Sequence, residues 1–411
     1  MPWQETSTVD ERVRFIAEYL DGLVTMTDLC MQYRISRETG YKWVARFEAE
    51  GPAGLQDRSR RPHTSPTATS PAVVQALLAA RRRHPRWGPK KLLAHGWLLP
   101  TRPALSTASA LLKQHGLVVP RRRRPRPAHP GRPTTPLTTP NGVWTIDFKG
   151  QFRTGDGTWC YPLTVADGCT RYLLACQALP SVRTAPTQAT LARIFRRFGL
   201  PDRIRSDNGV PFATSWALGH LSPLAVWWIR LGIVPERIEP GQPAQNGRHE
   251  RMHRTLKAET ARPPAATVAA QQRRFTAFRH AYNTERPHEA LGQRPPATLY
   301  VPSPRPFPAR LPAIEYAPSY VVRRVGPSGS LSWQSRRLSV SHTLIGQDIG
   351  LLEVDDARWA VYFGPVLLGH FDERRWCIHP IARLTPGALA SSAGSRPAVK
   401  NSNNVSTMSS D

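Results

Sequence analysis

The sequence predicts a multidomain protein with all-α helix-turn-helix units at the N-terminus, a central α/β domain and a small C-terminal β-barrel. Three observations support this order. Apolar residues recur at helical spacing before residue 120, and apolar runs alternate with helical patterns between residues 141 and 301. Short strand-like runs separated by Gly, Asp and Ser follow residue 319.

Shifts in composition predict the domain boundaries. Two Pro-rich stretches are too extended to form a core and mark linkers. We therefore expect a helix-turn-helix domain (1–58), a second helix-turn-helix-like domain (66–120), a basic Pro/Arg linker (121–140), the α/β domain (141–301), a Pro-rich linker (302–318), the β-barrel (319–385) and a disordered tail (386–411).

The net charge predicts a polyanionic partner. The chain has Lys+Arg 56 against Asp+Glu 29, a formal net charge of +27, and such an excess attracts the phosphates of nucleic acid. Between residues 51 and 136, Asp57 is the single acid. A membrane surface is the weaker alternative, because no amphipathic basic helix of the interfacial type accompanies the charge.

Targeting signals and cysteines favour a cytoplasmic protein. The N-terminus begins polar and lacks the apolar segment of a signal peptide. The uncharged stretch 209–229 contains prolines and His220, so we expect a loop and a buried helix there rather than a membrane span. The cysteines form no CxxC pair, so the sequence indicates neither a zinc finger nor a disulfide framework. This cysteine usage fits a reducing compartment. The cysteines are Cys30, Cys160, Cys169, Cys176 and Cys377.

The first domain predicts three helices. The first spans residues 11–20 and turns three apolar side chains inward: Val13, Ile16 and Leu20. Thr25 or Thr27 can cap the second helix, and Ser36 can cap the third, which runs to about residue 50.

The third of these helices is the predicted recognition helix. Trp43, Val44 and Phe47 supply its core face. The polar side chains are then left for contacts with a DNA groove or with phosphates. They are Arg37, Glu38, Thr39, Lys42 and Arg46. A purely structural three-helix bundle is the alternative, because any three short helices can show this pattern.

The second unit also predicts three helices, and a basic linker follows it. Its helices are expected at 71–83 and 89–97, followed by a third that Ser106 caps and that ends before Gly116. The linker contains the run Arg121, Arg122, Arg123 and Arg124, which we expect to follow DNA between domains. A nuclear-localisation signal is the compositional alternative for this run.

Three acidic residues of the central domain lie where structure alone does not call for them. Strands are expected at 143–148, 161–166, 172–177 and 203–206, with a helix at 187–198. Asp147 ends the first strand, Asp207 follows the last, and Glu250 lies in a helical run of roughly residues 247–260. A carboxylate at the end of an apolar strand is costly to desolvate without a compensating cation. Hard oxygen ligands suit Mg²⁺ or Mn²⁺, and two such ions support phosphoryl transfer.

Four ordered sequence blocks in this domain resemble the DDE transposases of bacterial insertion sequences, relatives of retroviral integrases. The blocks are 144–148, 205–212, 240–251 and 282–292. The resemblance implies a ribonuclease-H-like core in which Asp147, Asp207 and Glu250 are catalytic and bind two Mg²⁺ (or Mn²⁺) ions. It also implies a homo-oligomer on double-stranded DNA that binds terminal inverted repeats, cleaves the element ends and joins the 3′-OH to target DNA.

Other residues are expected to support this site. Asn208 and Gly209 would shape the loop beside Asp207, while Asn246 and Gly247 would open the Glu250 helix. Two basic residues follow Glu250 on the same helical face, one and two turns on. They are Arg254 and Lys257, and the resemblance to integrases implies that they meet DNA near the cleaved phosphate. Asp167 precedes Gly168 and favours a turn role over a metal role.

Alternatives remain open for the acids and for the function. Asp207 begins a sequence that also favours plain turns, Glu250 can pair with Arg254 in solvent, and Asp147 can pair with an arginine. The protein can also be an inactive or domesticated DNA-binding regulator, or a nuclease of the same fold that cuts without joining.

The C-terminal region predicts a further contact with DNA or a partner. Short strands are expected at 320–324, 330–333, 337–340, 349–354 and 359–363, and together they predict the small β-barrel. From residue 386 onward, Ser, Ala, Asn and Gly dominate and favour disorder.

Overall fold

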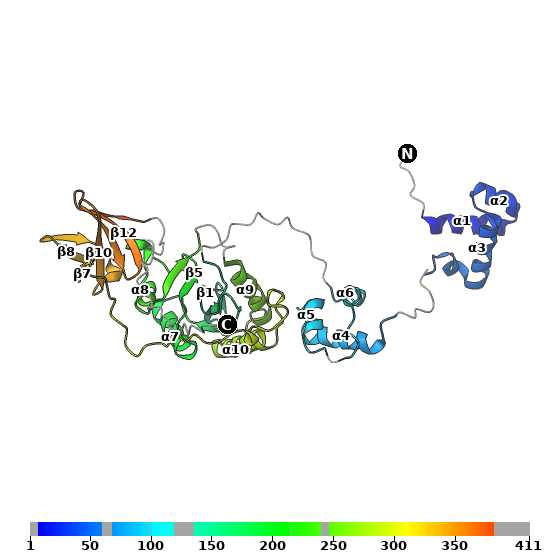
Figure 1. Ribbon diagram of the computed structural model, residues 1–411. Helices are drawn as coiled ribbons and strands as arrows, with labels where there is room; N and C mark the ends of the chain where they lie inside the picture. Colours follow the sequence, from blue (N-terminus) through cyan, green and yellow to red (C-terminus); the bar gives the residue numbers. More distant parts are fainter. Residues whose placement is uncertain are drawn as a thin grey trace, which may run out of the picture. The chain divides into compact units, whose positions relative to one another are not determined.

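A computed structural model describes residues 7–59, 68–97, 99–118, 135–214, 216–239 and 246–381 (Figure 1). The chain divides into two compact units, Met1–Ser70 and Pro71–Asp411, and each is described by itself. Two predicted features lie outside the described residues. They are the tail after residue 386 and the arginine run 121–124.

The first unit is a three-helix domain with capped helices. It comprises α1 (Thr8–Asp21), α2 (Met26–Gln32) and α3 (Arg37–Glu50), followed by the 3₁₀ turn η1 (Gly51–Leu55). Thr25 accepts the N–H of Asp28, and Ser36 accepts the N–H of Thr39, so both predicted caps are confirmed. Such caps satisfy backbone donors that the helix itself leaves unpaired.

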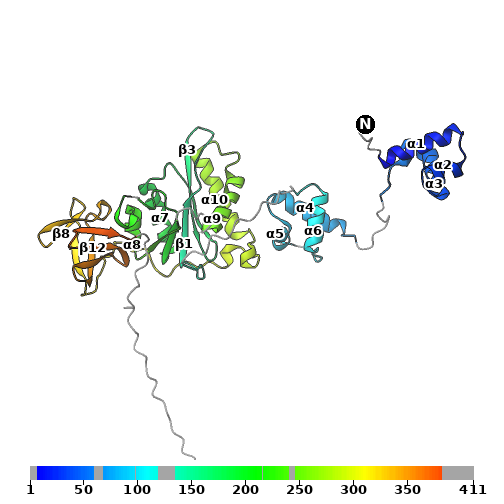
Figure 2. The same cartoon turned by 90° about the horizontal axis from the view of Figure 1, so that it is seen from above.

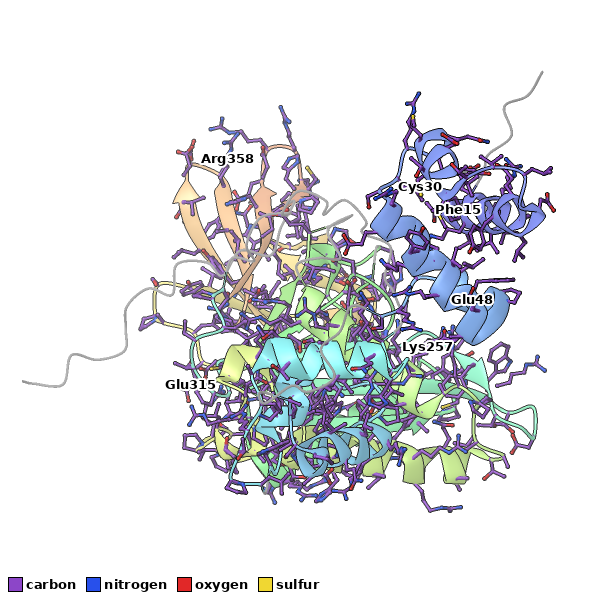
Figure 3. The ribbon with its side chains drawn as sticks, turned by 90° about the vertical axis from the view of Figure 1, so that its right-hand side faces the viewer. Phe15, Cys30, Glu48, Lys257, Glu315 and Arg358 are labelled. Carbon is purple, nitrogen blue, oxygen red and sulfur yellow. The ribbon has the colours of Figure 1, made fainter. Side chains whose placement is uncertain are left out.

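The core of this unit corrects one prediction. Phe15 and Cys30 lie buried between its helices (Figure 3), and Ile16 is also buried. Val13 and Leu20 are instead 47% and 63% exposed, so their inward placement was wrong. The buried stripe of α1 runs through adjacent Phe15 and Ile16, which turns positions 13 and 20 toward solvent.

Three shorter helices open the second unit. They are α4 (Pro71–Arg83), α5 (Pro89–Ala94) and α6 (Leu105–Gln114), packed around Leu77, Trp87 and Leu92. The predicted cap at Ser106 was wrong. The residue before α6 is Ala104, which makes no side-chain cap bond, and Ser106 lies inside the helix.

The central domain is built on a mixed sheet. Its strands are β1 (Val143–Phe148), β2 (Phe152–Arg153), β3 (Trp159–Asp167), β4 (Leu173–Leu179), β5 (Arg203–Ser206) and β6 (Val234–Arg237). Strand β3 pairs antiparallel with β1, β2 and β4. Strands β1, β5 and β6 run parallel. Strands β1, β3 and β4 form the three-strand antiparallel arrangement that the sequence predicts.

Helices cover both faces of this sheet (Figure 2). On one face lie α7 (Thr184–Phe198) and α8 (Pro223–Arg230), and on the other lie α9 (Gly247–Thr260) and α10 (Val268–Thr284). Because side chains alternate along a strand, Trp144 and Ile146 join the apolar cluster of α7 and α8. Thr145 and Asp147 therefore point toward the opposite face. That face carries Met252 of α9.

The C-terminal strands form an open sheet and a separate hairpin. The sheet order is β13-β12-β11-β10-β7, and β8 pairs with β9. A closed barrel is therefore not confirmed for the described strands. Residues of α8 share the hydrophobic cluster of these strands. The strands are β7 (Val321–Arg324), β8 (Ser330–Trp333), β9 (Arg336–Ser339), β10 (Asp348–Asp355), β11 (Arg358–Phe363), β12 (Val366–Asp372) and β13 (Cys377–Pro380).

Short 3₁₀ turns connect the larger elements. They are η2 (Leu218–His220), η4 (Glu289–Leu291), η5 (Pro296–Thr298) and η6 (His342–Leu344). Within the described ranges, none of the helices has the length and apolar character needed to cross a membrane. Cys30, Cys160, Cys169, Cys176 and Cys377 are free thiols.

Candidate active site

Parallel pairing brings Asp147 and Asp207 to one edge of the sheet. Thr145 of β1 and Arg205 of β5 are register partners. Asp147 lies two residues beyond Thr145, and Asp207 lies two residues beyond Arg205. Asp147 is the fifth residue of β1, and its side chain is 21% exposed. Asp207 directly follows β5. The carboxyl ends of parallel strands are where side chains can meet a substrate outside the sheet.

The loop after Asp207 is held by its own polar groups. The N–H of Gly209 donates to Asp207 Oδ1 at 3.2 Å. The Asn208 side chain donates to the carbonyl of Ile238 at 2.9 Å, so it ties this loop to the segment after β6. These contacts are compatible with the supporting roles expected for Asn208 and Gly209.

Helix α9 presents Glu250 to solvent and buries its other face. Glu250 is exposed, whereas His249, Met252 and His253 are buried. The helix starts at Gly247 as expected, and Asn246 occupies the N-cap position with 6% exposure. The Asn246 side chain makes no cap bond.

The charges of Asp207 and Glu250 both act on Asp147. Burial, and after it the neighbouring charge of Asp207, raise the pKa of Asp147 to about 7. Lys149 acts in the opposite direction, and the charge of Glu250 adds to the rise. Burial also raises the pKa of the Asp207 carboxyl above its ordinary value. Negative charges crowded in this way disfavour ionisation unless a cation compensates them.

These residues fit a divalent cation. Asp147 combines partial burial with two neighbouring carboxylates, a set of hard oxygen donors with an excess of negative charge. A group of three possible ligands also lies within 4.8 Å of one another. These are Asp147, His249 and His253.

The sequence reasoning missed the histidines beside this site. His253 Nδ1 lies 3.5 Å from Asp147 Oδ2. Burial lowers the pKa of His249 to about 3 and moves the pKa of His253 well below its usual range, so both rings are neutral at neutral pH. Their i, i+4 spacing around Glu250 was a usable signal, because such residues share one helical face.

The predicted DNA-contacting residues of α9 are exposed on the side of Glu250. Arg254 and Lys257 are both exposed, and Lys257 is labelled in Figure 3. Glu250 has neither residue as an ion-pair partner among the salt bridges of the described chain. Their charges are therefore available to a ligand.

The recognition-helix candidates differ in their accessibility. Arg37 and Lys42 are exposed, whereas Thr39 and Arg46 are half-buried. The backbone N–H of Thr39 serves the Ser36 cap at 3.2 Å. Arg46 lies 5.0 Å from the centre of the Trp43 ring, so part of its side chain packs on the domain.

Asp167 is a structural residue, as expected. Its side chain accepts the backbone N–H groups of Asn141 and Thr170 at 2.8 and 2.7 Å. It is 1% exposed. These contacts occupy the carboxylate in fixing the turn between β3 and β4.

Known families match most of this architecture. Residues 138–243 and 231–296 match families described as "Integrase core domain". Residues 11–63 match a "Helix-turn-helix domain", and residues 39–100 match a "Homeodomain-like domain". The uncharacterized 39.2 kDa protein of insertion element IS476 from Xanthomonas euvesicatoria is 30% identical over 251 residues, which cover 60% of this chain and 69% of that protein.

The chain belongs to the insertion-element transposases with an integrase-type core. A second relative of this transposase is the uncharacterized 31.7 kDa protein of insertion element IS407 from Burkholderia multivorans, 30% identical over 190 residues. That match covers 46% of the transposase and 65% of the relative. The helix-turn-helix domains and the core assign DNA recombination of the transposase type, and with it an enzyme of the polynucleotidyl transferase type.

Solved structures similar to the transposase include viral integrases. A chain of the simian T-cell lymphotropic virus intasome, in complex with PP2A regulatory subunit B56 gamma, shows 18% identity and a TM-score of 0.35, covering 71% of the transposase and 97% of that chain. The catalytic core of BIV integrase shows 19% identity and a TM-score of 0.30, and the match covers 39% of the transposase and 93% of that chain.

Proposed function

We propose that this transposase binds the terminal inverted repeats of its element, cleaves one strand at each end and joins the freed 3′-OH to target DNA. Asp147, Asp207 and Glu250 are the catalytic residues of this proposal. The observation that carries it is that Asp147 and Asp207 lie at one edge of the sheet, where the charges of Asp207 and Glu250 raise the pKa of Asp147.

Two divalent ions, Mg²⁺ or Mn²⁺, would supply activation of the attacking oxygen and stabilisation of the leaving oxygen when bound. The carboxylates of the triad would hold them. The structure supports this assignment through the excess of negative charge on hard oxygen donors around Asp147. Because phosphoryl transfer depends mainly on positioning and charge neutralisation, no residue of the chain needs to form a covalent intermediate.

Basic side chains complete the proposed DNA-binding surface of the core. Arg254 and Lys257 are exposed on the same helix as Glu250. Charge-assisted hydrogen bonds from these groups would hold the phosphate backbone beside the carboxylates. The α9 helix thus carries an acid of the triad and the cations that would bind its substrate.

The other contacts are assigned to the flanking regions. In the first unit, Arg37, Thr39, Lys42 and Arg46 of α3 would recognise the terminal repeats. The Arg121–Arg124 run would neutralise phosphates between domains. Exposed arginines of the C-terminal strands, such as Arg323 and Arg336, would provide a further contact with DNA. The active species would be a homo-oligomer, because both element ends must be held together.

A strand-transfer assay tests the proposal. The full chain is incubated with Mg²⁺, labelled DNA carrying the element's terminal repeats, and a supercoiled target. We expect nicks at the element ends and covalent joining of the labelled 3′ ends to the target. Nicking without joining would identify a nuclease, and specific binding without nicking would identify a regulator. Either result would contradict the proposed reaction.

A further inference from the structure

A buried polar cluster lies between the triad strand and the triad helix. Thr164 is 0% exposed, and His253 and His249 are 1% and 2% exposed. The two rings pack edge to face, with centroids 4.5 Å apart and planes at 90°. Polar groups buried to this degree require hydrogen-bond partners, because leaving one unpaired is costly.

The cluster forms a continuous chain of contacts that ends at Asp147. Thr145 Oγ1 lies 2.8 Å from His249 Nδ1, and Thr164 Oγ1 lies 2.6 Å from His249 Nε2. The same Thr164 oxygen lies 2.6 Å from His253 Nε2. His253 Nδ1 then lies 3.5 Å from Asp147 Oδ2, just beyond hydrogen-bond distance.

Counting protons gives this chain a direction. An ionised carboxylate only accepts, so the nitrogen that faces Asp147 must carry a proton. A neutral ring then has a lone pair on its other nitrogen, and His253 Nε2 accepts from the Thr164 hydroxyl. That hydroxyl has a single proton, so it must in turn accept from His249 Nε2–H. The Thr145 hydroxyl donates to the remaining His249 nitrogen, at 2.8 Å, rather than to the more distant Ala166 carbonyl oxygen at 3.2 Å, and every donor of the chain is used.

The reverse arrangement is less favourable. Thr164 can also donate to the carbonyl oxygen of Asp147, at 3.1 Å. Both ring Nε2 atoms would then have to donate to Thr164. His253 would face the carboxylate with a lone pair, which repels the negative charge. That repulsion favours the first direction.

We propose that His253 is a positioning residue for the triad: it presents Nδ1–H to Asp147 Oδ2 and restrains the rotation of that carboxylate. The inference rests on the proposed function, in which Asp147 holds a metal ion. Partners of this kind fix the orientation of ligating groups and raise metal affinity.

The same series of contacts fixes the separation between β1, which carries Asp147, and α9, which carries Glu250. Thr145 belongs to β1, Thr164 to β3, and both histidines to α9. Glu250 directly follows His249 on α9. Contacts that hold the histidines against β1 and β3 therefore also hold Glu250 at a defined separation from Asp147.

A direct metal-ligand role for His253 is the competing assignment. Both nitrogens of His249 are engaged by threonine hydroxyls, which leaves His253 Nδ1 as the nitrogen that faces Asp147. A lone pair there could bind a metal together with the carboxylate. The two assignments differ in whether this nitrogen carries a proton, and experiment can separate them.

The test compares paired variants of the full chain. In His253→Asn, the amide nitrogen can occupy the place of Nδ1, whereas in His253→Gln it can reach only the place of Nε2. Thr164→Ser keeps the hydroxyl and Thr164→Val removes it at similar volume. His280→Gln, at an exposed position of α10, is the matched control. Mn²⁺ affinity is measured without DNA by electron paramagnetic resonance, with thermal unfolding of the metal-free protein alongside.

We expect His253→Gln and Thr164→Val to weaken Mn²⁺ binding by about tenfold or more, the usual effect of losing such a partner. His253→Asn, Thr164→Ser and His280→Gln should bind close to the wild-type value. Equal affinities in both His253 variants, whether both retained or both lost, would overturn the proposal. Spin-echo modulation from an imidazole nitrogen bound directly to Mn²⁺ in the wild type would also overturn it.

Asp147→Asn separates failure of this inference from failure of the proposed function. If Asp147→Asn binds Mn²⁺ as the wild type does, the metal site itself is wrong, and the positioning role of His253 falls with it. If Asp147→Asn loses Mn²⁺ but His253→Gln does not, the metal site stands and only the positioning role is refuted.

Discussion

Asp147 and Asp207 lie two residues beyond Thr145 and Arg205, which are register partners on the parallel strands β1 and β5. The two carboxylates therefore leave the sheet at the same edge, although sixty residues of chain separate them. The raised pKa of Asp147, to about 7, is the electrostatic consequence of burial and of this neighbour.

Removing the Asp147 charge should stabilise the metal-free protein. A carboxyl whose folded pKa is raised from 3.8 to about 7 contributes stability that is fully present below pH 3.8 and is lost as pH rises through 7. Asp147→Asn carries no such group. Above pH 7 in EDTA, its Tm should exceed that of the wild type by a few degrees, since about 1 kcal/mol shifts Tm by roughly 2–4 °C in a domain of this size.

Differential scanning calorimetry at pH 5 and pH 8 checks this prediction. The advantage of Asp147→Asn should be smaller at pH 5, where the wild-type carboxyl is mostly protonated. Asp202→Asn, at an exposed aspartate of the same domain, serves as the control. A Tm difference that does not change with pH would contradict the raised pKa.

Replacing both Arg254 and Lys257 with Ala should weaken engagement of the cleavage site. Well-formed charge-assisted hydrogen bonds contribute about 1.5–3 kcal/mol each, so cleavage should fall tenfold or more at limiting DNA. A solvated ion-pair role would contribute only roughly 0.3–0.5 kcal/mol. Cross-linking of the protein to the terminal nucleotides measures the contact directly.

The control for this pair is Arg273→Ala, which removes an exposed charge from α10. It changes the net charge in the same direction without touching α9. If the double variant cleaves and cross-links as efficiently as Arg273→Ala, DNA must lie on another face of the domain.

The recognition helix should determine binding to the element ends. Arg37 and Lys42 are exposed on α3, so their joint replacement with Ala should reduce the preference for terminal DNA over random DNA. The plot of log affinity against log salt concentration should also become less steep. Its slope should fall by roughly one for each lost charge that contacts a backbone phosphate. Gel-shift titrations at several salt concentrations measure both quantities.

Arg14→Ala is the matched control, because Arg14 is exposed on α1 of the same unit. A loss of affinity with Arg14→Ala as large as with the α3 variant would mean that general charge, and not α3, carries the binding.

Local signals explain why much of the fold was predictable. The Ser36 cap and the bounds of α9 follow from short-range patterns: a hydroxyl that accepts a backbone N–H, and periodic apolar residues between two turns. Strand β12 was missed because Gly369 interrupts its apolar run. A Cβ at Gly369 would lie 2.5 Å from the His379 carbonyl oxygen, so tertiary crowding explains a glycine that looks like a strand breaker.

The three acids could be singled out from the sequence, whereas the contacts around them could not be predicted. Asp147, Asp207 and Glu250 stand in recognisable sequence blocks. The contact between Thr164 and His253 joins positions 89 residues apart, and a histidine on the apolar face of a helix looks like an ordinary core residue. Only pairing of β1 with β3 beneath α9 reveals that it reaches Asp147.

In the proposed reaction, three carboxylates carry both cleavage and joining. Single-turnover joining of pre-cleaved element ends, in Mg²⁺, is measured for Asp147→Asn, Asp207→Asn and Glu250→Gln. Each change removes a charge with little change in shape, so each should lower joining by orders of magnitude while binding of terminal DNA persists. Joining at near wild-type rates by any one of the three variants would contradict the assignment of that residue to the triad.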